Sequence, residues 1–415
     1  MNTGDIQIAL PPSKSLSNRW LVANYLLGEA FVLRNLSLSD DTVLMRRLLR
    51  QLKGGGSSVF YCDNGGTVAR FLLALLAISK GNFLLTGDAR LRQRPIDDLV
   101  VSLRSMGFDI TYAEQEGLLP VRVVGGEAQR KMVSIRASQS SQFVSALMLM
   151  GLALPSGISV TLVGRVASRP YIEMTAHVLR QAGVAVSISP NGHTYKVGSR
   201  QSEGGKQKTI TIENDWTSAS YFYAMAALAP GIRIRLRNLS LDSCQGDRCV
   251  ADIFAALGVS TQTVRSPYRT ASRSLVIVSL GKVESRLRYG FIDCPDLMPT
   301  VAVACAAMGI DAYLRGIRNL RLKESDRVSA IVEQLRQMGA RIDLDDDVMH
   351  LFPSKLHPID VVKTYGDHRI VMAFAPLLLL FPGMEIENPN LVSKSFPDFW
   401  TQFDQVRKCA TTNAS

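Results

Sequence analysis

A repeated pattern constrains the fold of this chain more than any other feature. Four times, a stretch of helical periodicity ends at a glycine and is followed by a short apolar strand. The four glycines, about 75 to 80 residues apart, are Gly107, Gly183, Gly258 and Gly339. A glycine in this place is typical of a left-handed helix C-cap. The pattern therefore predicts repeated helix-and-strand units, of which residues 44–52 with the glycines after them form a shortened early copy.

A longer repeat divides the chain into two related halves. The hexapeptide Leu-Arg-Asn-Leu-Ser-Leu occurs at 33–38 and again, unchanged, at 236–241, and residues 318–320 repeat its middle. A chain of 415 residues is also longer than one ordinary domain. We therefore expect two similar lobes that cross over near residues 213–215. The polar stretch 199–208 is predicted to be an exposed hairpin turn.

Each copy also contains a second helical stretch made of small apolar residues. Such stretches are apolar almost all round, so they are expected to be buried rather than surface helices. They span 67–78, 142–154, 218–228, 298–308 and 370–380. Three repeats per half, with strands wrapped around buried helices, predict an α+β fold of two similar lobes.

The charge balance favours an anionic partner. Lysine and arginine number 47 against 36 aspartate and glutamate, a formal net charge of +11. Nucleic acid, a membrane surface and a phosphorylated metabolite are all anionic. Because the basic residues are dispersed and form no basic strip interleaved with aromatic residues, nucleic acid is the weaker choice.

Metal sites and membrane spans are not expected. The six cysteines form no Cys-x-x-Cys pair and the five histidines are scattered. The first residues lack a signal-like apolar segment, and the apolar run at 371–381 is too short to span a bilayer. We therefore expect a protein of the reducing cytoplasm, without a metal.

Basic and hydroxyl side chains gather where predicted helices begin. The segment 11–19 opens the first helix with Lys14 and Arg19 and without an acid. A helix N-terminus presents unpaired N–H groups and a partial positive charge, so it favours a bound anion. A serine N-cap with solvated basic side chains is the alternative.

Similar clusters precede the other apolar helices. Residues 63–67 are predicted to form a glycine-rich turn, and residues 138–142 offer two adjacent hydroxyls. An ordinary turn and a helix cap are the alternatives for these two. In the second half, 321–327 packs three bases and two acids together, for which a surface ion-pair network is the alternative. Asp-His-Arg at 367–369 leads into an apolar helix and is harder to explain as packing.

The clusters share one chemistry. Many fixed positive groups around two carboxylates suit a site for more than one anionic substrate, with the acids serving proton transfer. No phosphate-binding loop, dinucleotide fingerprint or Ser-His-Asp pattern competes with this interpretation. The bases are Lys14, Arg19, Arg94, Arg327, Arg369 and Lys394, and the acids are Asp296 and Glu324.

In combination and in order, these motifs resemble the 5-enolpyruvylshikimate-3-phosphate (EPSP) synthase family, the 3-phosphoshikimate 1-carboxyvinyltransferases of the shikimate pathway. The resemblance runs from end to end. It rests on PPSKSLSNR at 11–19, NGGT at 64–67, RP at 94–95, SSQF at 140–143, SRPY at 168–171, SASYF at 218–222, QGD at 245–247, PD at 295–296, RNLRLKESDR at 318–327, DHR at 367–369 and KSFPDF at 394–399.

The resemblance implies a fold of two lobes, each of three βαββαβ repeats, in an inside-out α/β barrel. It places residues 14–213 in a lobe that binds mainly shikimate-3-phosphate. Residues 1–13 and 214–415 would form the second lobe, with the acid–base residues and much of the phosphoenolpyruvate site. The active site would lie in the cleft between the lobes, and the family expectation is a cytoplasmic monomer without a cofactor.

The resemblance also implies a role for each matching residue. Shikimate-3-phosphate would be bound by Lys14, Ser15, Arg19, Ser140, Ser141, Gln142, Ser168, Asp296, Asn319 and Lys323. Phosphoenolpyruvate would be bound by Lys14, Asn64, Gly66, Arg94, Gln142, Arg327, Arg369 and Lys394. Asp296 would be the base for the 5-hydroxyl, and Glu324, with Lys14, would handle the proton at the enolpyruvyl methylene.

The sequence departs from the family pattern at a few positions. Ser13 stands where glycine is frequent, Phe71 where proline is common, and Arg169 where lysine is frequent. The segment between residues 52 and 63 is short, so the first lobe is expected to lack a strand pair. These departures leave open the response to glyphosate, which competes at the phosphoenolpyruvate subsite in this family.

Two other functions compete with this one. The sister enolpyruvyl transferase that acts on UDP-N-acetylglucosamine carries a reactive cysteine in a mobile loop, whereas only Cys62 precedes residue 244 here. A catalytically inactive binding lobe would be expected to lack Lys14, Asp296, Glu324 or Arg327, and all four are present. Both alternatives are therefore weaker.

Overall fold

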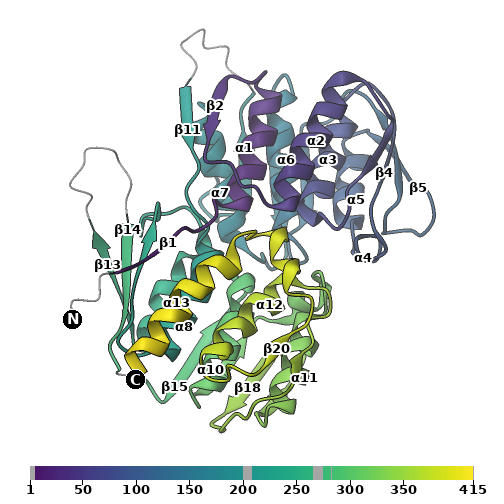
Figure 1. Cartoon of the computed structure of the whole chain (residues 1–415). Coiled ribbons are helices and arrows are strands. Elements are labelled where there is room, and N and C mark those ends of the chain that lie inside the picture. The colour runs from purple at the N-terminus through teal and green to yellow at the C-terminus, as the bar shows by residue number, and fades with distance from the viewer. Residues whose placement is uncertain (1–4, 200–207, 265–273, 282, 415) are drawn as a thin grey trace. The chain divides into compact units, whose positions relative to one another are not determined.

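The computed structural model describes residues 5–199, 208–264, 274–281 and 283–414. Its chain divides into two compact units: a first unit of Lys14–Ile212, and a second unit of Met1–Ser13 together with Glu213–Ser415. Figure 1 traces the chain through both. The hairpin turn predicted at 199–208 lies, apart from its end residues, outside the described residues.

The first unit contains two four-stranded sheets of one topology. In each, two parallel strands are joined by a buried helix, and an antiparallel strand pair follows a second helix. One copy consists of β3 (Val59–Tyr61), α3 (Gly66–Ala77), β4 (Gly81–Thr86), α4 (Ala89–Arg92), α5 (Asp97–Ser105), β5 (Asp109–Tyr112) and β6 (Val121–Gly125). The other consists of β7 (Met132–Arg136), α6 (Ser141–Met150), η1 (Gly151–Ala153), β8 (Ile158–Val163), α7 (Arg169–Gln181), β9 (Val186–Ile188) and β10 (Thr194–Val197).

A third, reduced copy completes the first unit. Among the residues that the structure describes, this copy has only the parallel pair β2 and β11, without the antiparallel strands. Its elements are α1 (Lys14–Leu26), β2 (Phe31–Arg34), α2 (Asp40–Gly54) and β11 (Lys208–Thr211). Because α2 is followed directly by β3, the expected loss of a strand pair after residue 52 is confirmed.

The second unit repeats this arrangement, with two full copies and one reduced copy. The first full copy is β1 (Ile6–Ile8), α8 (Trp216–Leu228), β12 (Arg233–Arg237), η2 (Gly246–Cys249), α9 (Val250–Ala256), β13 (Val259–Val264) and β14 (Ser274–Ser279). The next is β15 (Arg286–Gly290), η3 (Pro295–Leu297), α10 (Met298–Ala307), β16 (Asp311–Arg315), η4 (Arg318–Leu322), α11 (Arg327–Gln337), β17 (Arg341–Leu344) and β18 (Val348–Phe352). The reduced copy is β19 (Val361–Val362), α12 (His368–Phe374), η5 (Ala375–Leu379), β20 (Glu385–Ile386), η6 (Pro389–Lys394) and α13 (Phe399–Ala414).

The α+β class with two similar lobes is therefore confirmed, with one repeat of each lobe reduced to two strands. Among the described residues, no helix combines the length and the apolar character needed to cross a membrane.

The four glycines of the repeat end four helices in the same way. Gly107, Gly183, Gly258 and Gly339 each lie two residues beyond the end of a helix, with φ between +82° and +99°. At Gly183, the amide donates to the Arg180 carbonyl, and the next amide donates to Leu179. This is the Schellman arrangement, in which the left-handed residue turns the chain toward the following strand.

The apolar helices form the core, as predicted. Every residue of α12 is buried, and so is nearly every residue of α3, α6, α8 and α10. The stretch 370–380 is not one continuous helix, because α12 gives way to the 3-10 helix η5 just before Pro376. Because these helices are apolar and buried, polar functional groups can lie only at the helix ends and in the adjoining loops.

Candidate active site

In the first unit, side-chain hydrogen bonds of Arg19 and Gln142 link four helices. Arg19 is buried on α1 and donates to Thr175 Oγ1 on α7 (2.8 Å) and to Ser145 Oγ on α6 (3.2 Å). Gln142 at the start of α6 donates to Thr67 Oγ1 at the start of α3 (3.0 Å). None of these four helices carries an acid in its first turn. Their N-termini therefore offer unopposed positive potential.

Lys14 lies at the first position of α1. Its Nζ is 3.0 Å from the Asp41 carboxylate of α2, and both side chains are largely buried. The pair holds the ammonium at the start of the helix, close to Ser15, whose carbonyl accepts a hydrogen bond from Arg19 (2.9 Å). No motif in the sequence singles out Asp41, because its role depends on a contact with another helix.

Gly66 and Arg94 lie against each other. Gly66 is the first residue of α3, and a Cβ placed on it would lie 2.6 Å from Arg94 Nη1. A side chain here would displace the guanidinium. Asn64, half-buried, precedes them in a turn closed by the Gly65 amide and the Cys62 carbonyl (2.8 Å).

A second arginine contacts the backbone next to this turn. Arg70 is buried and donates to the carbonyls of Gly66 (3.2 Å) and Pro95 (3.0 Å), which adjoin the Gly66–Arg94 contact. Burial, together with the nearby Arg94 charge, holds the pKa of Arg70 well below its usual value. Two guanidinium groups in one place favour an anion beside them.

The remaining predicted residues of the first unit lie at the starts of α6 and α7. Ser140 caps α6, its hydroxyl accepting from the Gln142 amide (3.2 Å), and Ser141 is buried in the first turn. Ser168 precedes α7 in the left-handed conformation (φ +54°) and is half-buried. The structure therefore brings the predicted residues of the first unit to helix starts and to the loop that holds Arg94.

In the second unit, Arg327 is the centre of an ion-pair network. Its Nη1 lies 2.9 Å from Asp296 Oδ1, and its Nε lies 2.8 Å from Asp367 Oδ2. Arg369 Nη2 binds the other oxygen of Asp296 at 2.8 Å. Although burial opposes the charged form, these carboxylates raise the pKa of Arg327. Asp296 is thus held between two guanidinium groups.

Asp367 holds Arg327 and the start of α12 in place. It is fully buried, accepts from Arg327 and from Ser325 Oγ (3.0 Å), and caps α12 through the Arg369 amide (2.9 Å). Burial alone would raise its pKa, but the Arg327 charge dominates and lowers it. In the sequence, Asp367 belongs to the Asp-His-Arg motif, but a motif does not show the direction of a side chain and so gives this residue no role.

Glu324 lies beside the same network. His368 Nδ1 is 2.7 Å from Glu324 Oε2, and Lys394 Nζ is 3.5 Å from Oε1. Burial works to raise its pKa, but His368 and Lys394 together hold the pKa of Glu324 well below its usual range. Asn319 and Lys323, both half-buried, lie in η4 and at its end, just before Glu324.

One further buried carboxyl adjoins Asp296. Asp247, the second residue of η2, accepts a hydrogen bond from Thr217 Oγ1. Burial and the negative charge of Asp296 raise the pKa of Asp247 to about 7. The sequence signalled it only through the QGD motif at 245–247.

Glu324, Asp367 and His368 are also close enough together to ligate a metal ion by their atom types. The carboxylates, however, already face cations, since Arg327 contacts both acids and Lys394 contacts Glu324. A dication here would have to displace or repel these groups. The arrangement suits an anion rather than a metal.

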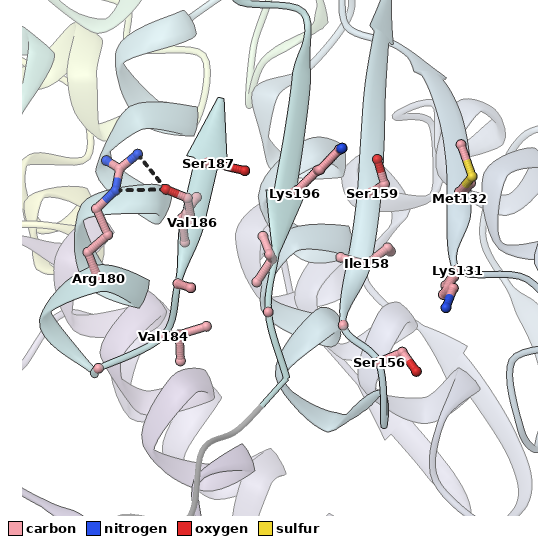
Figure 2. Close-up of a pocket in the computed structure, with 15 residues that line it drawn as sticks. Lys131, Met132, Ser156, Ile158, Ser159, Arg180, Val184, Val186, Ser187 and Lys196 are labelled. Carbon is pink, nitrogen blue, oxygen red and sulfur yellow. Dashed lines mark hydrogen bonds between the residues drawn. The ribbon is translucent and has the colours of Figure 1, made fainter. Parts of the chain in front are cut away.

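A separate hollow lies on the first unit, away from these residues. Its volume is about 820 Å³, and it follows the ends of the β7–β8–β10–β9 sheet, where Lys131, Ile158, Arg180 and Lys196 line it (Figure 2). None of the predicted site residues is among its lining residues. Arg180, near the end of α7, donates to the carbonyl of Val186 at the start of β9 (3.2 Å).

Comparison with known proteins identifies relatives of this chain. Residues 3–403 match the model of the family EPSP synthase (3-phosphoshikimate 1-carboxyvinyltransferase). A curated 3-phosphoshikimate 1-carboxyvinyltransferase of Bacteroides fragilis is 35% identical over 396 residues, covering 95% of this chain and 93% of the relative. One from Idiomarina loihiensis is 32% identical, covering 96% of each.

Solved structures share the fold. EPSP synthase from Acinetobacter baumannii superposes with a TM-score of 0.72 at 22% identity, covering 96% of this chain and 95% of that one. The enolpyruvyl transferase NikO from Streptomyces tendae gives 0.70 at 13% identity, covering 96% and 94%. At these identities the likeness bears on the fold alone.

Proposed function

Because the chain belongs to the EPSP synthase (3-phosphoshikimate 1-carboxyvinyltransferase) family, we propose that it transfers the enolpyruvyl group of phosphoenolpyruvate to the 5-hydroxyl of shikimate-3-phosphate and releases phosphate. The observation that carries this function is the network in which Arg327, Arg369 and Lys394 surround two carboxylates, Asp296 and Glu324. Fixed cations bind the anionic substrates, and the carboxylates move protons.

The shikimate-3-phosphate site is proposed at the acid-free helix starts of the first unit. The hydroxyls of Ser140, Ser141 and Ser168 would hold the phosphate, since helix N-termini favour anions. The other proposed ligands on this unit are Lys14, Ser15, Arg19 and Gln142. Asp296, Asn319 and Lys323 would contact the ring hydroxyls.

The phosphoenolpyruvate site is proposed to take its groups from both units. Gly66, Asn64, Arg94, Lys14 and Gln142 would contribute from the first unit. Arg327, Arg369 and Lys394 would contribute from the second. We propose that substrate binding brings these two groups of residues to one site in a cleft between the units, which would exclude water from the intermediate.

The proposed reaction is an addition followed by an elimination. A proton added to C3 of phosphoenolpyruvate leaves C2 electrophilic, and the substrate 5-hydroxyl adds to C2 as Asp296 takes its proton. Loss of a C3 proton and of phosphate from this tetrahedral intermediate then restores the double bond. The arginines stabilise the anionic groups throughout.

Glu324 is proposed to carry the proton at C3, with Lys14. Although burial opposes it, the low pKa of Glu324 comes from His368, Lys394 and Arg327. An anion bound to Lys394 and Arg327 would oppose their effect and raise the pKa of Glu324, so that the carboxyl could be protonated when the substrate is present.

We also propose that the protein acts in the cytoplasm as a monomer. The described cysteines are all free thiols, which suits a reducing compartment. The proposed site is complete within one chain. Size-exclusion chromatography with light scattering tests the second point, and a dimer whose dissociation abolishes turnover would contradict it.

Phosphate release tests the reaction. We expect release only when phosphoenolpyruvate and shikimate-3-phosphate are both present, and expect Asp296→Ala and Glu324→Gln each to lower kcat by about 100-fold or more. Asp343→Asn, at an exposed position of β17, is the matched control and should leave kcat unchanged. Release that requires UDP-N-acetylglucosamine instead, or no release with either acceptor, would contradict the proposal.

A further inference from the structure

Arg169 links the start of α7 to the β9–β10 hairpin, and the proposed reaction gives it no role. It is the first residue of α7, and its Nη1 donates to the carbonyl of Gly192 at 2.8 Å. Gly192 lies in the turn between β9 and β10 and has a φ of +69°. A Cβ placed on Gly192 would lie 3.3 Å from Arg169 Nη1, so the hairpin backbone and the guanidinium pack closely.

Hydrogen bonds hold this hairpin turn in one conformation. The Gly192 amide donates to the Ser189 carbonyl (2.8 Å), and the Ser189 amide donates to the Thr194 carbonyl (2.9 Å). The Ser189 hydroxyl also accepts from the Thr194 amide (2.9 Å). The Asn191 side chain accepts from the His193 amide (3.1 Å). The Gly192 carbonyl is therefore a fixed acceptor.

Tyr195 joins α7 to the hairpin a second time. It lies on β10 and is fully buried, and its hydroxyl donates to the Glu173 carboxylate, one turn beyond Arg169 on α7. Arg169 Nη1 also donates to the Tyr195 hydroxyl oxygen, at 3.5 Å. The first two turns of α7 are thus attached both to β10 and to the hairpin turn.

Ser168 stands immediately before Arg169 in a strained backbone conformation. Its φ of +54° and ψ of +42° lie in the left-handed region, which is costly for a residue with a Cβ. Its side chain makes no capping hydrogen bond, so α7 does not use this hydroxyl. A strained conformation of this kind persists only where the surrounding structure fixes the neighbouring residues.

The backbone before Ser168 is tied to the loop that carries the other two proposed phosphate hydroxyls. The Ala167 amide donates to the Ala137 carbonyl (2.9 Å). Ser140 and Ser141 follow shortly after Ala137 in the sequence. The place of the Ser168 hydroxyl relative to those two then depends on the backbone that follows it, which is the first turn of α7.

We propose that Arg169 is a positioning residue for phosphate binding: by holding the start of α7 against the β9–β10 turn, it keeps Ser168 in the left-handed conformation in which its hydroxyl binds the phosphate of shikimate-3-phosphate. The inference rests on the proposed function, which makes Ser168 a phosphate ligand. Arg169 acts through Ser168 rather than on the substrate, since its Nη1 already donates to Gly192 and Tyr195.

The expected effect is on the affinity for one substrate. Arg169→Met removes the hydrogen bond and keeps an unbranched side chain. Ser168 then leaves the strained conformation for others, and a charge-assisted hydrogen bond to the phosphate is lost. We expect the Kd for shikimate-3-phosphate to rise about 10-fold. Arg169→Lys keeps one donor for the Gly192 carbonyl and should stay within about 3-fold of the parent.

Calorimetric titration of the full chain with shikimate-3-phosphate measures this Kd without turnover. Arg180→Met is the matched control, because Arg180 lies near the other end of α7 and donates to the Val186 carbonyl of the same hairpin (3.2 Å). It removes the same charge and the same kind of bond and should leave the Kd unchanged. An unchanged Kd in Arg169→Met, or an equal loss in the two variants, would overturn the proposal.

A double-mutant cycle with Ser168→Ala shows whether Arg169 acts through Ser168. If it does, Arg169→Met should weaken binding by less than about 2-fold once the Ser168 hydroxyl is absent. The full loss of about 10-fold in the Ser168→Ala background would show that Arg169 acts on the phosphate directly or on the fold as a whole, and would overturn the proposal.

Turnover separates this inference from the proposed function. Arg169→Met should raise the KM for shikimate-3-phosphate and leave kcat and the KM for phosphoenolpyruvate within about 2-fold of the parent, because the bond is made equally in the ground state and the transition state. A fall in kcat without a change in this KM would overturn the proposal. A parent chain that binds shikimate-3-phosphate but releases no phosphate would contradict the proposed function instead, and the Kd values would still decide the role of Arg169.

Discussion

Gly66 determines where the Arg94 guanidinium can lie. Its added Cβ would stand 2.6 Å from Arg94 Nη1, so Gly66→Ala must move the guanidinium away from the start of α3. Losing one charge-assisted contact raises the KM for phosphoenolpyruvate by about 10- to 100-fold, with a smaller effect on the KM for shikimate-3-phosphate. Steady-state kinetics measure both. Gly126→Ala is the control, because its Cβ would meet nothing within 4 Å, and equal effects of the two variants would refute this account.

Asp367 is the buried counter-ion of Arg327. Since its pKa is lowered in the folded protein, its contribution to stability is present above its unfolded pKa of about 3.9 and is lost as the pH falls through the folded value. Asp367→Asn should lower the free energy of unfolding by about 3 to 5 kcal/mol at pH 7. The difference in the free energy of unfolding between the parent and Asp367→Asn should become smaller as the pH falls below about 4.

Urea denaturation across pH measures this. The exposed pair of Arg318 and Asp346 offers the matched control, because Asp346→Asn should cost about 1 kcal/mol or less. A deficit for Asp367→Asn that stays constant down to pH 3 would show that lost packing, rather than lost charge, is responsible.

Asp247 should give the opposite pH dependence. Burial and the charge of Asp296 raise its pKa to about 7, so between about pH 4 and pH 7 the folded protein binds a proton that the unfolded chain has released. Stability therefore falls as the pH rises through this range. Asp247→Asn cannot ionise, so its stability relative to the parent should be greater at pH 8 than at pH 5, by about 1 to 3 kcal/mol.

Thermal unfolding with calorimetry at the two pH values provides the measurement. Asp252→Asn, an exposed acid on the adjacent α9, should show no such difference. If Asp247→Asn loses more stability at pH 8 than at pH 5, the residue is ionised in the folded protein and the account is wrong.

At the scale of elements, a glycine cap ends one helix in each full repeat and turns the chain toward the next strand. Gly183 has a φ of +82° and open space where a Cβ would be, so Gly183→Ala tests backbone strain without a steric clash. We expect a loss of about 1 kcal/mol in the free energy of unfolding, and a smaller loss for Gly183→Asn.

Gly54, the last residue of α2, also has open space for a Cβ but lacks a positive φ. Gly54→Ala should therefore be neutral or stabilising by a few tenths of a kcal/mol. Equilibrium denaturation compares the two variants, and equal destabilisation would exclude the left-handed cap as the cause.

An element or a contact could be predicted when the residues that determine it are neighbours in the sequence, and could not when they are far apart. The caps at Gly107 and Gly183 and the buried helices α3 and α10 follow from local pattern, which the sequence displays directly. The pairing of Lys14 with Asp41 depends instead on how two helices pack. Local residue order does not determine such contacts, so the motifs predicted which residue types gather but not their partners.

Asp367 illustrates the same limit inside a motif. The triplet at 367–369 predicted a polar cluster at a helix start, and the structure places one there. Which member faces Arg327, and which faces Glu324, depends on rotamers and packing that the triplet does not encode. The catalytic and binding roles of the site residues stay predictions until kinetics test them.

At the scale of the whole molecule, each unit has its own buried helices and sheets, and the first is continuous in sequence. We expect residues 14–212, expressed alone, to unfold cooperatively in denaturant, because the apolar faces of α3 and α6 pack within that unit. The fragment should show no phosphate release, since Asp296 and Glu324 belong to the other unit. Circular dichroism and the phosphate assay measure these outcomes, and a fragment without a cooperative transition would contradict the first.

The parallel pairing of β1 with β12 has a consequence for how the chain is made. Ile6 pairs with Ile234 and Ile8 with Leu236, so β1 can pair with β12 only after Leu236 has been synthesised. All of Lys14–Ile212 emerges in the interval. During translation the nascent chain therefore carries β1 as an unpaired strand, and slow elongation lengthens the time in which a neighbouring polypeptide could pair with it.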